Sequence, residues 1–274
     1  MVTRRHSRAG SVVVAAGLLV SPLGCAPGAP GDDPAASDPV DLLHRAAPTL
    51  VRAGSSKTRT EMEMATGGTR VTIHGEGVYD YGRQLGRLKV LLPQDPAGTS
   101  EHRPITELLT PGALFMKNRG AGVPADKWVR VDTGTLSDGN LVTGGATDPL
   151  AAAEVLRGAR SATYVGRAEI DGTPVSHYRG TADLTAASRA ASAGNRAPLR
   201  AAARGFATAT VPFDAYLDDE GRIRKVRHRF SFVNGRQQDS VDVASTTLLY
   251  DFGVHVTVRL PRPEDIYAGK IAED

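Results

Sequence analysis

Histidine and cysteine, the side chains that most often carry metal or nucleophile chemistry, are scattered along this chain. It has 274 residues, with one cysteine and seven histidines. Metal sites on one helix or strand use H-x-x-x-H or H-x-H spacing, and no two histidines here have either spacing. We therefore expect no metal site and no cofactor. The histidines are His6, His44, His74, His102, His177, His228 and His255.

The usual catalytic motifs are also missing. The sequence has no G-x-S-x-G, S-x-x-K, G-x-x-x-x-G-K-[ST] or G-x-G-x-x-G, so we expect a protein that is not an enzyme. Three weaker features have structural and functional interpretations. We interpret His177 as a strand residue with a structural hydrogen bond rather than a general base. Asp218 to Glu220 indicate a solvated turn rather than a calcium site, and Trp128 indicates packing rather than sugar stacking.

Cys25 follows a short apolar run near the N-terminus. The first ten residues contain three arginines and no acid, and the apolar stretch from Val12 to Val20 is too short for a membrane span, which needs about twenty residues. Leu23 and Gly24 before Cys25 resemble a bacterial lipobox in a shifted order. We expect a lipoprotein signal peptide over 1–24 and a diacylglyceryl group, with its palmitate, on Cys25. The alternative is a secreted protein with a free thiol.

The charge balance excludes one class of partner. The net charge is +3, but removing Arg4, Arg5 and Arg8 with the signal takes the 33 basic residues to 30, equal to the 30 acidic residues. No Lys/Arg cluster with aromatic residues occurs, so we expect no nucleic-acid binding. Residues 25–39 are rich in proline, glycine and alanine, which is typical of a flexible tether. One folded domain is expected over 40–274.

Apolar spacing predicts an α+β domain. Asp38 and Asp148 cap helices from Pro39 to about Ala53 and from Pro149 to Ala159, and the alanine-rich stretch 184–206 forms two helical pieces broken at Gly194 and Pro198. We expect about eleven antiparallel strands with three helical insertions. The strand segments are 58–64, 69–81, 84–92, 105–110, 113–118, 127–132, a hairpin over 161–184 with its turn at Asp171-Gly172, 210–218, 222–232, part of 239–250, and 251–260.

Four segments resemble a known family in the same order along the chain. They are KWVRVD, VGRAEIDGTPVSHYRGTADL, FDAYLDDEGRIRKVRHRFSF and DFGVHVTVRLPRPEDI. They are similar to the actinobacterial LppX/LprA/LprF/LprG lipoproteins, which belong to a wider LolA-like group, and the resemblance covers about Val40 to Ile266. It implies a single curved antiparallel sheet of about eleven strands, an incomplete half-barrel with helices over its concave face. It also implies an apolar cavity that binds the acyl chains of lipids or glycolipids.

The residues that would line such a cavity are apolar and come from predicted inward-facing positions. A buried methylene group contributes about 0.8 kcal/mol, so an acyl chain of sixteen carbons needs on the order of 12 kcal/mol of burial. Methionine adapts to irregular guests. The candidates on the strands are Met62, Met64, Val71, Ile73, Leu88, Val90, Leu92, Leu114 and Met116, and those on the covering helix are Leu150, Val155 and Leu156.

Two functions follow from this set of residues. The first is a cell-surface lipoprotein, anchored to the outer face of the bacterial cell membrane, that carries a lipid in a cavity between sheet and helices. The second is a non-enzymatic interaction or sensor lipoprotein, in which the same side chains form a filled core and an envelope protein binds outside. Apolar walls serve both functions, so the sequence leaves both open.

Overall fold

Eleven strands form one open antiparallel sheet in a computed structural model that describes residues 38–66, 68–93, 103–120, 122–233 and 240–268. The strand order is β6-β5-β4-β3-β2-β1-β11-β10-β9-β8-β7. The predicted single antiparallel sheet of about eleven strands is thus confirmed. The strands are β1 (Ser55–Thr66), β2 (Thr69–Asp80), β3 (Leu85–Leu91), β4 (Ile105–Thr110), β5 (Ala113–Lys117), β6 (Trp128–Asp132), β7 (Ala159–Ile170), β8 (Thr173–Asp183), β9 (Thr210–Leu217), β10 (Ile223–Val233) and β11 (Ser240–Tyr250).

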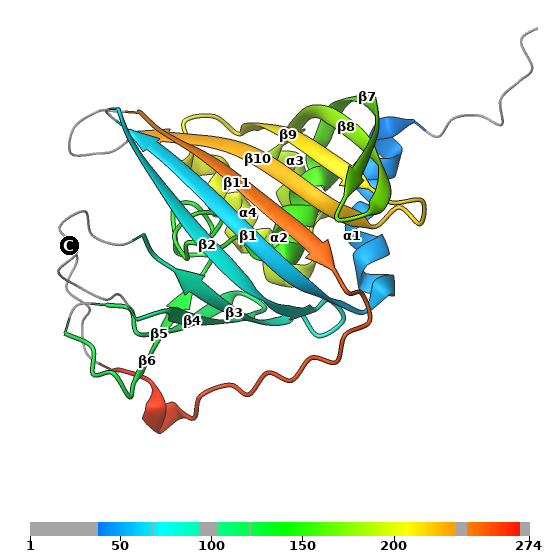
Figure 1. The fold of residues 1–274 in the computed structure, drawn as a ribbon. Coiled ribbons are helices and arrows are strands. Elements are labelled where there is room, and N and C mark those ends of the chain that lie inside the picture. The colour runs from blue at the N-terminus through cyan, green and yellow to red at the C-terminus, as the bar shows by residue number, and fades with distance from the viewer. Residues whose placement is uncertain (1–37, 67, 94–102, 121, 234–239, 269–274) are drawn as a thin grey trace, which may run out of the picture. The chain divides into compact units, whose positions relative to one another are not determined.

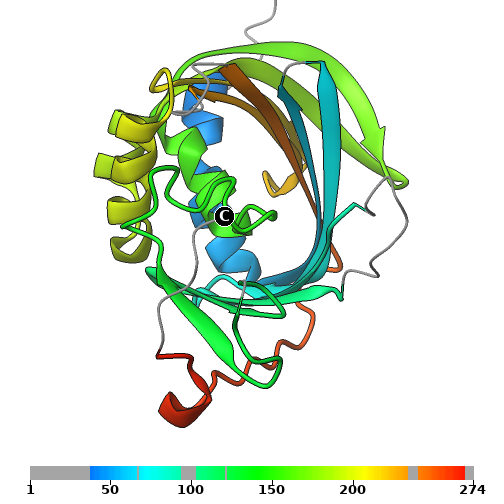
Figure 2. The same cartoon turned by 90° about the vertical axis from the view of Figure 1, so that its left-hand side faces the viewer.

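The sheet consists of two meanders that join at its middle. β1 to β6 pair in chain order on one half, and β7 to β11 pair in chain order on the other (Figure 1). β1 joins the halves by pairing with β11, where Thr60 lies opposite Thr247. Figure 2 shows the sheet curling around the helices, so that it has a concave face and an outer face.

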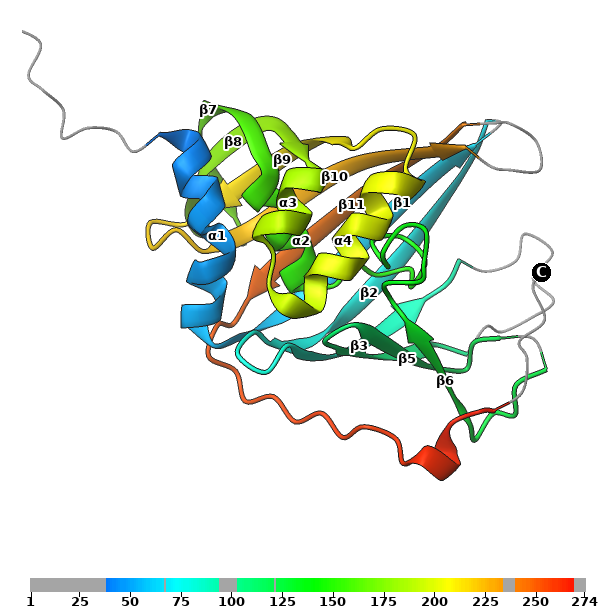
Figure 3. The same cartoon turned by 180° about the vertical axis from the view of Figure 1, so that it is seen from behind.

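The helices cover the concave face (Figure 3). They are α1 (Pro39–Ala53), α2 (Pro149–Val155), α3 (Leu184–Ala190) and α4 (Ala193–Gly205), with 3-10 turns at Leu156–Gly158 and Pro263–Asp265. The predicted caps are present. Asp38 accepts a hydrogen bond from the Val40 amide, and Asp148 accepts from the amides of Leu150 and Ala151. No helix of the described residues is long and apolar enough to cross a membrane.

Two glycines of β2 allow close approach inside the fold. A Cβ at Gly75 would lie 3.1 Å from the Cβ of Ala146, and a Cβ at Gly77 would overlap the backbone oxygen of Arg87. Glycine weakens a strand unless another part of the chain must come near. These two positions therefore let β3 and the segment before α2 pack directly on the β2 backbone.

The alanine-rich stretch breaks at a different point from the one predicted. The break lies at Ala191 and Ser192, and α4 runs through both Gly194 and Pro198. Gly194 is tolerated because it occupies the second position of the helix, where the amide has no intrahelical acceptor. The start of α4 is instead fixed by Glu154 of α2, which accepts hydrogen bonds from the Ser192 amide and hydroxyl.

The predicted strand over 251–260 is wrong. β11 already pairs with β1 and β10, so the chain after Tyr250 meets no free sheet edge. It crosses the outer face of the sheet near β3 to β6 as an extended strap (Figure 1). The strap is tied at its start by the Gly253 amide to the Ser55 oxygen, and at its end by a parallel bridge between Ile266 and Trp128.

Candidate functional site

The predicted cavity residues come together as one packed hydrophobic core. Nine of the twelve candidates are buried members of a single cluster, and the other three, Met64, Val71 and Leu92, pack against it partly buried. The side chains pack on each other, on α2 and on the segment before α2. Their role in binding a ligand stays a prediction, and an acyl chain would enter only if some of these groups moved. The nine are Met62, Ile73, Leu88, Val90, Leu114, Met116, Leu150, Val155 and Leu156.

The segment 133–147, between β6 and α2, fills the concave interior over β2 to β4. It has no regular structure, and much of its hydrogen bonding is internal. The Asp138 carboxylate accepts from the amides of Asn140, Val142 and Thr143 at 2.6–3.1 Å. Its bonds to the rest of the fold include those from Arg119 to the oxygens of Thr143 and Gly144. We call it the 133–147 segment.

Polar groups also lie in this interior, and sequence reasoning missed them. Glu107 is fully buried on β4, and neither carboxylate oxygen has a hydrogen-bond partner among the described residues. Burial raises the pKa of Glu107 to about 8, while the positive charge of Arg119 opposes the rise. Burial also lowers the pKa of His228 on β10 to about 3. Strand alternation was the available signal, because Glu107 shares a face with Ile105 and Leu109.

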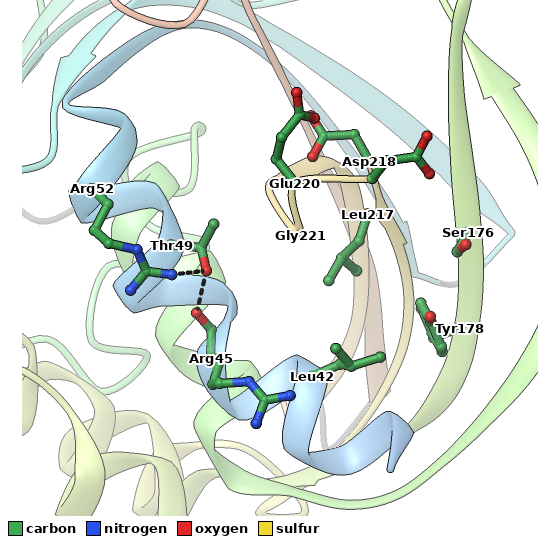
Figure 4. Close-up of a pocket in the computed structure, with 11 residues that line it drawn as sticks. Leu42, Arg45, Thr49, Arg52, Ser176, Tyr178, Leu217, Asp218, Glu220 and Gly221 are labelled. Carbon is green, nitrogen blue, oxygen red and sulfur yellow. Dashed lines mark hydrogen bonds between the residues drawn. The ribbon is translucent and has the colours of Figure 1, made fainter. Parts of the chain in front are cut away.

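A pocket opens at the α1 end of the interior. It has a volume of about 400 Å³ and lies between α1, β8, the end of β9 and the turn at 218–221 (Figure 4). Tyr178 and Leu217 on one wall belong to the hydrophobic core, and Leu42 on the other packs against it. The hydrophobic core thus forms part of the pocket wall. The lining residues are Leu42, Arg45, Thr49, Arg52, Ser176, Tyr178, Leu217, Asp218, Asp219, Glu220 and Gly221.

The rim of the pocket is charged. Arg45, Thr49 and Arg52 lie along one side of α1, with Leu217 and Tyr178 across the pocket from them (Figure 4). Arg52 donates a hydrogen bond to the Thr49 hydroxyl at 2.8 Å, and that hydroxyl donates to the Arg45 oxygen at 2.9 Å. The pocket thus combines apolar side chains on its walls with charged side chains at its rim.

The predicted turn and the other singled-out residues have structural contacts. Asp218 to Gly221 do form a turn, but Asp218 is buried and paired with Arg222 at 2.8 Å rather than solvated. Trp128 packs in a small second cluster with Leu108 and Phe115, on the outer face of the sheet beneath the strap. Among the described residues, no three His, Cys, Asp or Glu side chains gather as a metal site.

His177 makes the structural hydrogen bond that we expected. Its Nε2 lies 2.8 Å from Oδ1 of Asp214. The same oxygen accepts a hydrogen bond from Arg179, and the other oxygen, Oδ2, accepts one from Arg229. Burial by itself would raise the pKa of Asp214, but these hydrogen bonds and the charge of Arg179 outweigh it and lower the pKa. The His177 ring also stacks on Tyr216, with 4.2 Å between ring centroids. This cluster joins β8, β9 and β10.

The predicted signal peptide, Cys25 and most of the tether lie outside the described residues. Lipidation of Cys25 therefore stays a prediction.

No family model and no curated protein matches this chain. Solved structures similar to it include LprF from Mycobacterium bovis, which is 15% identical, covers 81% of this chain and 96% of that chain, and has a TM-score of 0.44. The lipoprotein LppX from Mycobacterium tuberculosis is 9% identical over 80% of this chain and 99% of that chain, with a TM-score of 0.43. A LolA superfamily protein from Nitrosomonas europaea is 10% identical over 79% and 95%, with a TM-score of 0.34. The structures that this chain is similar to thus include LppX and LprF, two of the lipoproteins that its sequence resembles.

Proposed function

We propose that the protein is an envelope lipoprotein that binds an amphiphilic lipid and shelters its apolar tail between the curved sheet and the helices. The observation that supports this proposal best is the pocket at the α1 end, because two side chains of its wall, Leu217 and Tyr178, belong to the hydrophobic core. A tail that enters there leaves water and reaches hydrocarbon side chains at once, which is the main source of free energy for lipid binding. Cys25 would hold the protein on the outer face of the membrane.

Because the interior is packed, an acyl tail can enter only if part of the protein moves. The 133–147 segment is the part best suited to do so. Many of its hydrogen bonds are internal, around Asp138, and would persist if it moved as a unit. It also covers Glu107, whose carboxylate gains water when the segment lifts. Proteins open locally in contiguous cooperative units, and a segment with its own hydrogen-bond network can be such a unit, although Leu141 and Ala146 would have to leave the core. Hydrogen exchange should therefore become faster in this segment when ligand is added.

A pair of substitutions on one helix tests the binding site. Leu42→Trp would fill the pocket from α1, whereas Val51→Trp adds the same bulk at a position that is 44% exposed and outside the pocket. We expect the Leu42 variant to lose uptake of a fluorescent fatty acyl probe and the Val51 variant to bind like the unmodified protein. Thermal unfolding of both variants shows whether they fold. Uptake that is equal in all three proteins, or absent from the unmodified protein, would refute the proposal.

The second candidate function is an interaction or sensor lipoprotein with a filled core. The observation in its favour is that nine predicted cavity residues are packed together and buried. It predicts that gently isolated protein contains no lipid by mass spectrometry and that a pull-down recovers one envelope protein in equal amount. Retained lipid would count against it.

The anchor is tested separately from the binding site. We expect Cys25→Ala to release the protein from the membrane fraction while leaving acyl-probe uptake unchanged. A variant that stays in the membrane fraction would remove the lipid anchor from the proposal without affecting the pocket.

A further inference from the structure

The pocket at the α1 end carries two guanidinium groups that have no carboxylate partner in the described part of the chain. Arg45 and Arg52 are exposed, line the pocket and form no ion pair with any described residue. The one side-chain hydrogen bond of Arg52 goes to a neutral hydroxyl, that of Thr49. Isolated arginines are common on surfaces, but here two share one side of a helix and one pocket.

The carboxylates on the opposite wall are already neutralised. Asp219 pairs with Arg167 at 3.0 Å, and Glu220 pairs with Arg222 at 2.9 Å. Asp218 is buried and pairs with Arg222 at 2.8 Å and with Arg224 at 3.9 Å, so three arginines face the three carboxylates. The acidic turn therefore offers no free negative charge to the α1 arginines, and the uncompensated charge of the pocket is positive.

The spacing on α1 suits a group that both arginines reach. Arg52 comes seven positions after Arg45, which is about 10 Å along the helix axis and nearly two full turns, so the two long side chains start from the same side of α1. Guanidinium groups donate pairs of parallel hydrogen bonds, and phosphate oxygens accept them in that geometry.

We propose that Arg45 and Arg52 bind the phosphate headgroup of a lipid at the mouth of the pocket, while Leu42, Tyr178 and Leu217 contact the start of its tail. This inference rests on the proposed function and adds the class of ligand to it, a phosphate-bearing lipid rather than a neutral one. Free inorganic phosphate has the same headgroup chemistry without the tail, so the test separates the two sources.

The test uses three probes on the purified protein by titration calorimetry below micelle-forming concentrations. The probes are a lysophosphatidylglycerol, a monoacylglycerol of the same chain length, and inorganic phosphate. We expect lysophosphatidylglycerol to bind at least about tenfold more tightly than monoacylglycerol, because charge-assisted hydrogen bonds are lost with the phosphate. The double variant Arg45→Gln, Arg52→Gln should remove this difference and leave monoacylglycerol binding unchanged.

The matched control is Arg200→Gln with Arg204→Gln, which removes two exposed arginines from α4 and gives the same net charge. It should bind all probes like the unmodified protein. If monoacylglycerol and lysophosphatidylglycerol bind equally, or if the control loses as much affinity as the α1 variant, the headgroup inference is wrong and the proposed function stands. If neither lipid binds, the proposed function fails. If inorganic phosphate binds as tightly as the lysolipid, the pocket is a free-anion site and both are overturned.

Discussion

Glu107 and Glu154 are both buried in the concave interior, yet their surroundings differ completely. Glu154 on α2 accepts hydrogen bonds from the Ser192 amide, the Ser192 hydroxyl and the Asn195 side chain at 2.7–3.0 Å. Glu107 on β4 accepts none from the described residues. The first carboxylate lies where helices fill the interior, and the second lies beneath the irregular 133–147 segment.

The difference separates a carboxylate with several hydrogen-bond donors from one with none among the described residues. Glu154 caps α4, so an acidic side chain supplies acceptors at the helix N-terminus, where free amides need them. Glu107 has a raised pKa, which means that the closed structure disfavours its charged form. A buried polar group without a partner costs about 1–3 kcal/mol, so the fold stores that cost beneath the segment most able to move.

The largest expected effect comes from removing the satisfied carboxylate. Glu154→Ala leaves three donors of Ser192 and Asn195 without acceptors in a buried site, and we expect the free energy of unfolding to fall by about 3 kcal/mol. Urea denaturation followed by circular dichroism measures it. Glu169→Ala, at an exposed position on β7, is the control and should change stability by less than about 0.5 kcal/mol. An equally small loss at Glu154 would show that its hydrogen bonds contribute little.

The second prediction is that removing the unsatisfied carboxylate increases the free energy of unfolding. Glu107→Leu replaces a buried acid by a hydrocarbon of similar size among Leu88, Met116 and other core residues, so we expect stability at pH 8 to rise by about 2 kcal/mol. The same denaturation experiment measures the gain. A loss of stability would mean that Glu107 has a partner, and the contrast with Glu154 would disappear.

Sequence predicted the local features around these two residues but not the contrast between them. The caps at Asp38 and Asp148, the Asp171-Gly172 turn and most strand limits depend on neighbours within a few residues, and the structure has them. The partners of Glu154 lie 38 to 41 residues away in the chain. Whether the apolar walls enclose a cavity or a core depends on where the 133–147 segment lies. That segment has no regular structure, so its sequence has no apolar periodicity from which its position could be predicted.

The third prediction uses pH to isolate Glu107. Its pKa is 4.5 in the unfolded chain and about 8 in the fold. The destabilisation caused by ionising it in the fold is therefore absent below pH 4.5 and grows until pH exceeds 8. His228 lowers the free energy of unfolding as pH falls from 6.5 towards 3, because its buried ring disfavours the proton. Burial raises the pKa of Asp148 to about 6, so the destabilisation caused by its ionisation reaches its full size soon above pH 6. Between pH 7 and 8.5 mainly Glu107 titrates.

We therefore expect the free energy of unfolding to fall by about 1 kcal/mol between pH 7 and 8.5. Glu107→Gln cannot lose a proton, so its stability should be flat over the same range. Denaturation midpoints at three pH values in that range suffice for the measurement. A slope that persists in the variant would assign the titration to another group.

The smallest expected effect concerns Arg119, which binds the 133–147 segment and whose charge acts on Glu107. Its guanidinium donates to the oxygens of Thr143 and Gly144, and its charge is the opposing influence on the pKa of Glu107. Arg119→Gln should free the 133–147 segment, with amide hydrogen exchange there faster by about fivefold and global stability changed by less than about 1 kcal/mol. It should also raise the pKa of Glu107 further and so move the pH-dependent loss of stability to higher pH.

Arg130→Gln, at an exposed position on β6, should change neither property. If exchange in the segment stays slow in the Arg119 variant, the segment is held by its packing on Gly75 and Ile73, and an acyl chain would have to make room by moving helices instead.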